Sequence, residues 1–272
     1  MHHDKTQPTA ATALRPMRPT ELLGTAFGLY RRRWRTLLAI VAIAVPLAVS
    51  FPSTKVIPGA GGEYHVLVHH RVVATGGSWA DTAVVALAML AAALVFAVVA
   101  GAVTRAAVAA VAGEDLGVRR SYRFGIVRVW PLLLVILLTW LSTMLGIVLL
   151  VVPGVIVGVL LAVSIPAQVV EGRRARAALS RSWKLVAGHW WHTFGTLLLT
   201  WLLLGVAANL VINAVGGLGH DWLVETIAQA LSIVLVTPFA ALVGVLLYLD
   251  LRARKEPLDT EVLRRDLEAS GV

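Results

Sequence analysis

The amino-acid sequence predicts an all-α fold, a polytopic transmembrane helical bundle with six spans arranged as three hairpins and with cytoplasmic amphipathic entry helices. Three observations lead to this prediction. Of the 272 residues, 58% are hydrophobic and only 14% are charged, whereas a soluble domain of this length needs more charge to cover its surface. The apolar residues form long uncharged runs. Lys and Arg cluster in alternate connections between those runs.

Six apolar runs have about the length of a membrane span, roughly 17–25 residues. They fall at 36–51, 82–104, 131–152, 154–170, 193–215 and 226–249. Residues 131–170 form 40 consecutive positions without a charge, and one helix of that length would be roughly twice as long as the hydrocarbon layer is thick. The chain must therefore turn within this stretch. We expect the turn at Pro153 and Gly154, because proline stops a helix and glycine tolerates a tight turn.

The basic residues predict the orientation of these spans. Of 24 Lys and Arg residues, 22 lie before the first span, in the second-to-third and fourth-to-fifth connections, or after the last span. Only Lys55 and Arg71 lie on the other side. Because cytoplasmic segments are enriched in Lys and Arg, we expect both termini in the cytoplasm and a location in the cell membrane. The basic residues behind the net charge of +9 would then face anionic lipid. This distribution explains the charge without a nucleic-acid partner, and we expect none.

This topology divides the chain into three parts. Residues 1–19 are predicted to be a disordered cytoplasmic tail, 20–256 a six-span membrane domain with an outer loop at 52–79, and 257–272 a short cytoplasmic C-terminal tail. A cleaved signal peptide is an alternative for the first apolar run, since basic residues precede it. The segment before that run is about 35 residues long, which is long for a signal, so we favour a retained span.

A basic, aromatic-rich segment precedes each odd-numbered span. In each segment an aromatic residue lies seven or eight positions before a tryptophan, in the pairs Phe27 and Trp34, Tyr122 and Trp130, and Trp183 and Trp190. This spacing predicts a parallel internal repeat of three two-span units. Seven of the nine tryptophans mark the edges of spans, as indole rings do at membrane interfaces. Trp140 and Trp201 fall within spans, and we expect them to pack between helices.

The third entry segment shows two faces at 100° per residue. Its apolar face consists of Ala175, Ala178, Leu179, Ser182, Trp183 and Val186. Its basic face consists of Arg173, Arg174, Arg176, Arg181 and Lys184. Two interpretations are open. The helix packs beneath the bundle as a topological anchor, or its cations and Trp183 contact anionic lipid of the inner leaflet or a membrane protein partner.

Few polar residues or helix breakers lie inside the spans. Asn209 and Asn213 are one turn apart in the fifth span, which predicts an interhelical hydrogen-bond pair or a contact to a ligand in a cavity. Gly154 and Gly158 form a GxxxG pattern, a weak signal for close helix packing. Prolines that predict helix kinks interrupt the first, fourth and sixth spans, at Pro46, Pro166 and Pro238.

The sequence predicts no catalytic residue, metal or cofactor. No Asp, Glu, Lys, Arg or His lies within the six spans; Asp81, Arg105, Glu171 and Asp250 lie at their ends. Proton relays and coupled transport need such groups at membrane depth. Cysteine is absent, and no nucleotide-binding or hydrolase motif occurs. The segment 64–73 is predicted to be extended or a hairpin; two of its histidines, at 65 and 69, without accompanying acidic or Cys ligands do not predict a metal site.

Several short motifs follow one another along nearly the whole chain. They are Arg18-Pro-Thr-Glu-Leu-Leu, Ala26-Phe-Gly-Leu-Tyr-Arg, Val152-Pro-Gly, Ile165-Pro-Ala with Glu171, Ala178-Leu-Ser-Arg-Ser-Trp-Lys-Leu with Gly188, Leu247-Tyr-Leu-Asp-Leu-Arg and Arg254-Lys-Glu. In order and spacing the chain resembles the membrane domain associated with glycerophosphoryl diester phosphodiesterases. Enzymes with this domain keep their catalysis in an attached soluble barrel. The resemblance implies a stand-alone membrane domain here, because only 22 residues follow Asp250.

The sequence thus favours a non-enzymatic multi-pass integral membrane protein that organises lipid or a partner at the inner leaflet. The alternative is a permease or half-transporter for a small amphiphilic or lipid-like solute. That alternative predicts a cavity at membrane depth lined by Asn209, Asn213, Thr200 or Gln229. An enzyme ranks third, since no nucleophile, base or metal set lies within the spans.

Overall fold

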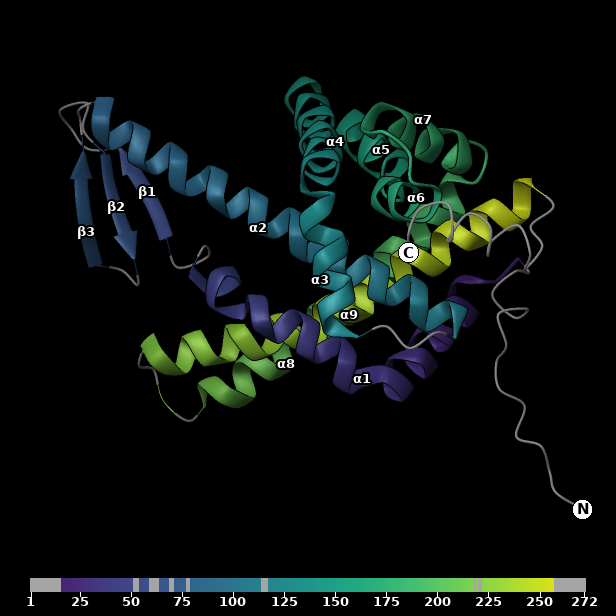
Figure 1. The fold of residues 1–272 in the computed structure, drawn as a ribbon, viewed down its shortest axis with the longest axis horizontal. Helices are drawn as coiled ribbons and strands as arrows, with labels where there is room; N and C mark the ends of the chain where they lie inside the picture. The colour runs from purple at the N-terminus through teal and green to yellow at the C-terminus, as the bar shows by residue number, and fades with distance from the viewer. Residues whose placement is uncertain are drawn as a thin grey trace, which may run out of the picture.

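The computed structural model describes residues 16–50, 54–58, 64–68, 71–76, 79–113, 117–217, 219 and 222–256. Long helices dominate it, and a small sheet lies between the first two (Figure 1). In chain order the elements are α1 (Pro19–Ser50), β1 (Thr54–Pro58), β2 (Tyr64–Val68), β3 (Arg71–Gly76), α2 (Trp79–Ala112), α3 (Val118–Val127), α4 (Val129–Leu149), α5 (Val151–Leu160), α6 (Ser164–Glu171), α7 (Ala175–Val186), α8 (Trp190–Gly216) and α9 (Trp222–Lys255).

Five helical stretches are long and apolar enough to cross a membrane. They are Met89–Ala112, Val129–Leu149, Val151–Glu171, Trp190–Gly216 and Leu223–Lys255. They coincide with the second to sixth predicted spans, so the chain has the build of a multi-pass helical membrane protein. The first predicted span falls in α1, which is helical to Ser50. The side chains of residues 44–50 lie outside the described residues, so the count of six spans stays a prediction.

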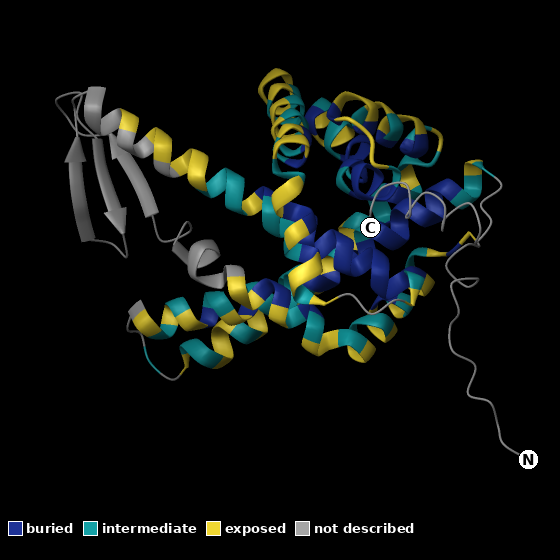
Figure 2. Ribbon diagram, viewed as in Figure 1, coloured by how far each residue is buried: buried dark blue, intermediate teal, exposed yellow. Residues whose placement is uncertain are grey.

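The helix α9 lies at the centre of the structure. It packs against α1, α2 and α8, and its side chains Leu242, Leu246 and Tyr248 are fully buried. Figure 2 shows the buried residues gathered where the second half of α9 meets its neighbours. The hairpin of α4 and α5 stands across the direction of α1, α2, α8 and α9 (Figure 1). Both α4 and α8 expose many large apolar side chains, a surface suited to lipid.

The turn between α4 and α5 lies at Leu150, three residues before the predicted position. Leu150 is extended (φ −166°, ψ 142°). Pro153 instead lies in the first turn of α5, where a helix loses nothing by a missing N–H. A Cβ on Gly154 would lie 2.6 Å from the Ile147 nitrogen and 2.8 Å from its Cα. Gly154 therefore permits the close packing of α4 against α5 that the GxxxG pattern predicted.

The fourth predicted span is broken rather than only kinked. The helix α5 ends at Leu160 and α6 begins at Ser164, so Pro166 lies in the first turn of α6. Proline cannot donate to the carbonyl four residues earlier, and the chain leaves the helix before it. Pro238 lies inside α9 as predicted. The side chain of Pro46 lies outside the described residues, and the non-helical position inside α1 is Arg33 (φ −118°, ψ 17°).

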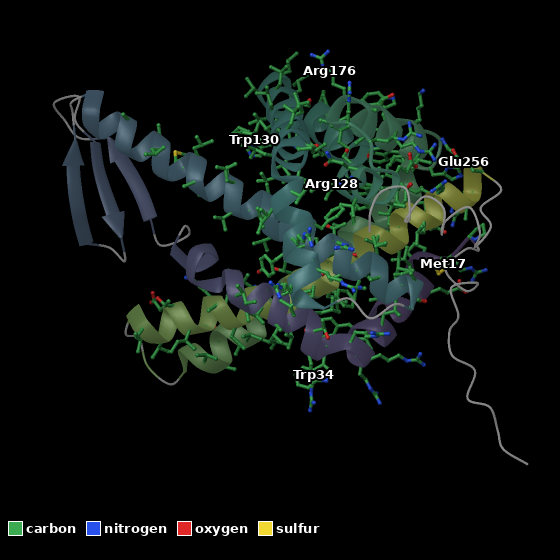
Figure 3. All side chains as sticks on the ribbon, viewed as in Figure 1. Met17, Trp34, Arg128, Trp130, Arg176 and Glu256 are labelled. Atoms are coloured by element: carbon green, nitrogen blue, oxygen red, sulfur yellow. The ribbon has the colours of Figure 1, made fainter. Side chains whose placement is uncertain are left out.

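Two expectations about tryptophan are wrong. The side chains of Trp140 and Trp201 are 60% and 72% exposed and do not pack between helices. The reason is that α4 and α8 lie at the periphery, so their mid-span indoles face outward. Trp34 and Trp130, predicted at a membrane boundary, are also exposed and project from α1 and α4 (Figure 3).

The two segments outside the bundle also refine the predictions. The predicted disordered tail 1–19 is too long, because Met17 is buried and α1 begins at Pro19; residues 1–15 and 257–272 lie outside the described residues. Within the outer loop, β2 and β3 form the predicted hairpin with a register shift between Val66 and Leu67, and β1 adds a third antiparallel strand. The residue at position 69 lies outside the described residues.

The variant Gly154→Ala tests the contact between α4 and α5. The added methyl group has no room against the Ile147 backbone, so the helices must separate. We expect a loss of about 1–3 kcal/mol of unfolding free energy and a lower Tm in detergent. Gly205→Ala in α8 is the control, because no atom lies within 4 Å of a Cβ there and alanine favours helix. Equal Tm values for Gly154→Ala and the unsubstituted protein would contradict this packing.

Candidate functional site at the basic end

The basic segments of the chain meet at one end of the structure. Arg33 donates to the Gly113 carbonyl (3.3 Å), and Arg105 donates to the Arg120 carbonyl (2.7 Å). The Met17 N–H donates to Asp250. These bonds join the start of α1, the end of α2, the start of α3 and the end of α9. We call this region, together with α7, the end of α6 and the starts of α4 and α8, the basic end.

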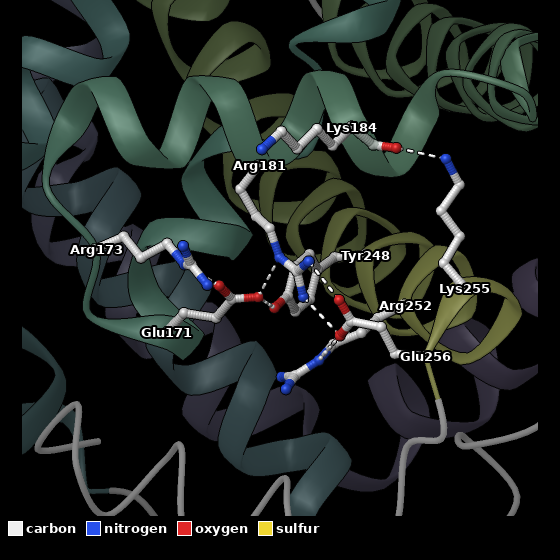
Figure 4. A network of polar contacts seen from close by, with 8 residues as sticks. All are labelled: Glu171, Arg173, Arg181, Lys184, Tyr248, Arg252, Lys255 and Glu256. Carbon is white, nitrogen blue, oxygen red and sulfur yellow. Dashed lines mark hydrogen bonds and ion pairs between the residues drawn. The ribbon is translucent and has the colours of Figure 1, made fainter.

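A buried carboxylate, Glu171, is the centre of one polar network there (Figure 4). The Tyr248 hydroxyl donates to its Oε1 over 2.5 Å, and Arg181 Nε donates to the same oxygen over 2.7 Å. Arg173 donates to Oε2. A buried carboxylate is costly unless it is paired and hydrogen-bonded. Glu171 meets both conditions, with donors from α7, from α9 and from the loop before α7.

Arg181 continues this network to the end of α9. Its Nη1 and Nη2 donate to the two carboxylate oxygens of Glu256 over 2.5 and 2.7 Å, the two-pronged geometry in which Arg binds carboxylates most strongly. Arg252 adds a bond over 3.2 Å. The Arg181 hydrogen bond, followed by its charge and by Arg252, lowers the pKa of Glu256 to about 2. Arg181, whose own pKa is raised by Glu256 and Glu171, therefore bridges two carboxylates.

A second network surrounds Asp250, which is 0% exposed. Its Oδ1 accepts the Met17 N–H over 2.6 Å, and its Oδ2 accepts from Arg254 Nε over 2.9 Å. Arg254 also donates to the Met17 carbonyl over 2.7 Å. The Nε2 of His192 lies 2.9 Å from the same Oδ2. Both backbone groups of Met17 are thus held by α9, which docks the start of α1 and the start of α8 on it.

The spacing of the polar residues along α9 explains why it serves two partners. Tyr248, Arg252 and Glu256 recur every four residues and face α6 and α7, whereas Asp250 and Arg254 face Met17 and α8. Residues four apart share one helix face. The ammonium group of Lys255 donates to the carbonyls of Lys184 and Ala187 at the end of α7. These carbonyls lack helical partners, so Lys255 caps α7.

A hydroxyl group from each entry segment donates to a backbone carbonyl of another helix. Ser182 donates to the Leu160 carbonyl (2.8 Å) and Tyr122 to the Ile40 carbonyl (2.5 Å). Tyr30 donates to the Leu235 carbonyl (3.1 Å), three residues before Pro238. In lipid, backbone groups released at breaks need internal partners. The Ser182 bond satisfies the carbonyl at the break between α5 and α6.

Two of these hydroxyl groups have the same spacing from a tryptophan in the sequence. Tyr122 lies eight residues before Trp130, and Ser182 lies eight residues before Trp190. These two hydroxyl donors therefore have the same spacing from a tryptophan, and the repeat of three two-span units stays a prediction. The first segment differs, since its donor Tyr30 lies four residues before Trp34.

The structure divides the predicted lipid-contact residues into two groups. Arg173 and Arg181 are committed to Glu171 and Glu256. The second group consists of the exposed residues Arg174, Arg176, Lys184 and Trp183. Arg173 is exposed as well, although it is paired with Glu171. The opposite face of α7 is buried, through Ala175, Ala178, Ser182, Leu185 and Val186, and packs against α4, α5, α6 and α9. The helix α7 is thus anchored beneath the bundle and still presents cations outward.

The structure does not bring Asn209 and Asn213 into an interhelical pair. Both are exposed on α8. Asn209 donates to the Gly205 carbonyl (3.0 Å) and Asn213 to the Asn209 carbonyl (2.7 Å). Asparagine readily bonds to the backbone of its own chain segment, and α8 provides the carbonyl one turn earlier.

Sequence reasoning placed Glu171 and Asp250 at the ends of spans but did not predict that they organise the site. The sequence did contain a signal for their role. The chain has only 15 acidic residues against 24 basic ones, and an isolated carboxylate beside an apolar run needs a cation as partner. Met17 gave no such signal, since its backbone rather than its side chain is held.

The carboxylates of Glu171, Asp250 and Glu256 are each paired with an arginine. No group of three or more His, Asp or Glu residues that could hold a metal occurs among the described residues. His192 is paired with Asp250. Burial, followed by Arg254 and Lys255, lowers the pKa of His189. The geometry is that of a structural clamp with a cationic outer surface.

No protein-family model, curated protein or solved structure matches the chain. The resemblance to the membrane domain associated with glycerophosphoryl diester phosphodiesterases therefore stays a prediction, which rests on the motifs alone.

The variant Ser182→Ala tests the bond at the helix break. It leaves the buried Leu160 carbonyl without its donor, and we expect a loss of about 1–3 kcal/mol of unfolding free energy. Ser180→Ala is the matched control, because Ser180 is exposed on the same helix and alanine favours helix. Unfolding in mixed detergent micelles measures both. If the two variants unfold alike, Ser182 does not secure α7.

The lowered pKa of Glu256 predicts a dependence of stability on pH. Its carboxyl group releases its proton more readily in the folded protein than at the ordinary value of 4.5. Its contribution is therefore complete above about pH 4.5 and is lost as the pH falls towards about 2. We expect Glu256→Gln to be less stable than the unsubstituted protein at pH 6 and the difference to shrink at pH 3. Unfolding measured across this range checks it; a constant difference would show that the charge of Glu256 is not involved.

Proposed function

We propose that this protein is a non-enzymatic multi-pass protein of the cell membrane that gathers anionic lipid at the inner leaflet through its basic end. The observation that carries the proposal is the division of α7. One face is buried in the bundle, while Arg174, Arg176, Lys184 and Trp183 are exposed. A helix that is clamped on one face and cationic on the other is suited to the headgroup plane.

Exposed tryptophans at the basic end support this depth. Trp34, Trp130, Trp183 and Trp191 are all exposed, and they come from α1, α4, α7 and α8. Indole rings favour the boundary between headgroups and hydrocarbon. Four helices thus present such a ring beside or close to a basic segment of the chain.

The charges set the strength of the lipid contact. A basic residue close to an anionic membrane surface contributes about 1 kcal/mol. Three exposed cations, two on α7 and Arg174 at its N-cap, therefore enrich anionic lipid around the protein, and the enrichment falls with salt. This strength is sufficient to select lipids by charge but not to distinguish one anionic lipid from another.

The buried networks give the outward cations a fixed position. Because Arg181 is bound by Glu171 and Glu256 and Lys255 caps the end of α7, the helix cannot turn its basic face toward the bundle. Clamping and lipid contact are therefore two functions of the same helix. The permease alternative has less support, since Asn209 and Asn213 lie exposed on α8 and Thr200 donates to the Thr196 carbonyl of its own helix.

The double variant Arg176→Gln/Lys184→Gln tests this proposal without touching the networks. The protein is purified from vesicles of equal phosphatidylglycerol and phosphatidylcholine, and the ratio of the two lipids that stay bound is measured. We expect the unsubstituted protein to retain mainly phosphatidylglycerol, and the double variant to reduce this enrichment about two-fold or more.

The control for this experiment removes the same charge elsewhere. Lys55→Gln/Arg71→Gln neutralises the two basic residues predicted on the other side of the membrane and should leave the enrichment unchanged. Equal enrichment in the α7 variant and the unsubstituted protein would overturn the proposal.

A further inference from the structure

A pocket of about 200 Å³ lies at the basic end between the start of α4 and the end of α6. We call it the α4–α6 pocket, and Arg128 in Figure 3 marks its position at the junction of α3 and α4. Its lining residues are Phe124, Arg128, Pro131, Leu132, Gln168, Val169, Gly172, Arg173 and Arg174. It lies where two predicted spans meet the same membrane surface, which is the depth of lipid headgroups.

The side chain of Gln168 lines this pocket, and its amide lacks hydrogen-bond partners among the described residues. Its side chain is 3% exposed. Neither its Nε2 nor its Oε1 has a hydrogen-bond partner in the described part of the chain. Buried amides are nearly always hydrogen-bonded, because an unpaired one is unfavourable. A buried glutamine on the wall of a pocket therefore indicates a ligand that supplies the missing partner.

The charge of the pocket selects an anion. Three of its lining residues are arginines and none is acidic. Arg174 is exposed, and Arg173 offers the part of its guanidinium that is not used by Glu171. Arg128 lies over the Phe124 ring, 5.0 Å from its centroid. Guanidinium groups match the geometry of phosphate oxygens.

The backbone at Gly172 places two of these arginines. Gly172 ends α6 in the left-handed conformation (φ 62°, ψ 18°), which other residues adopt only with strain. The chain turns there, so that Arg173 and Arg174 follow Gln168 onto the wall of the same pocket.

The rest of the wall favours a lipid over a free ion. Pro131, Leu132 and Val169 are apolar. On the same helix as Pro131, the side chains of Trp130 and Leu134 are exposed and offer a surface on which an acyl chain can lie.

We infer that the α4–α6 pocket binds the phosphate group of one anionic phospholipid, with Arg128, Arg173 and Arg174 contacting the phosphate oxygens and the Gln168 amide donating to one of them. The inference rests on the proposed function, since it assumes that the basic end faces inner-leaflet headgroups. Beyond the general enrichment of anionic lipid by α7, it assigns one defined site that holds a single lipid.

The test is Gln168→Leu, which removes the amide and nearly conserves its volume. Native mass spectrometry of the protein in detergent, titrated with phosphatidylglycerol, counts the bound lipids. We expect the unsubstituted protein to retain one lipid more tightly than the others, and Gln168→Leu to weaken that lipid at least ten-fold. The Tm of lipid-free Gln168→Leu should be equal to or higher than that of the unsubstituted protein, because no unpaired amide remains. Unchanged retention of the first lipid would overturn the inference.

Two further arms identify the ligand and separate this inference from the proposed function. Inorganic phosphate that binds as tightly as the lipid and displaces it would overturn the assignment to a lipid. Arg176→Gln/Lys184→Gln lies outside the pocket and should leave the first lipid bound while it reduces overall enrichment. If enrichment is unchanged in that variant but Gln168→Leu loses the first lipid, the general proposal fails and the pocket stands.

Discussion

The buried carboxylates at the basic end are the constraint on which the rest of the structure depends. Asp250 and Glu171 lie next to apolar helices where an unpaired charge is prohibitively costly, so each must be surrounded by donors. Those donors come from α7, α8, α9 and the segment before α1. Satisfying two acids therefore brings together parts of the chain that are separated by up to 233 residues. The alternating faces of α9 allow one helix to do this for both.

The same pairing decides which charges remain for the membrane. Arg181 lies in the middle of the α7 sequence and has the same character there as Arg176 or Lys184. In the structure Arg181 forms ion pairs with Glu171 and Glu256, whereas Arg176 and Lys184 are exposed. The basic helix is thus part of the clamp and, in the proposed function, also the surface that faces lipid. The anchor interpretation thus describes the paired and buried residues of α7, and the proposed lipid contact concerns its exposed cations.

Sequence reasoning predicted the elements whose signal is local. Run lengths identified five spans that the structure describes, since they depend on residues near each other in the chain. The 100° periodicity identified most of the buried face of α7, but it placed Trp183 there, which is 48% exposed. Sequence reasoning placed the turn three residues late, because Pro153 is equally compatible with a first helical turn. It misplaced Trp140 and Asn209 because a single sequence does not tell which helices lie at the periphery. Two features could not be predicted from the sequence, namely the unpaired Gln168 amide and the hydrogen bonds of Asp250 and Arg254 to the Met17 backbone. Both arise from segments that only folding brings together.

A double-mutant cycle between Glu171 and Tyr248 tests the central claim most directly. The two side chains lie on different helices and are joined by one short hydrogen bond within the buried network. The free energy of unfolding is measured for Glu171→Gln, for Tyr248→Phe and for the double variant. If the network clamps the basic end, the two substitutions should be coupled by more than about 1 kcal/mol. Additive effects, with a coupling close to zero, would contradict it.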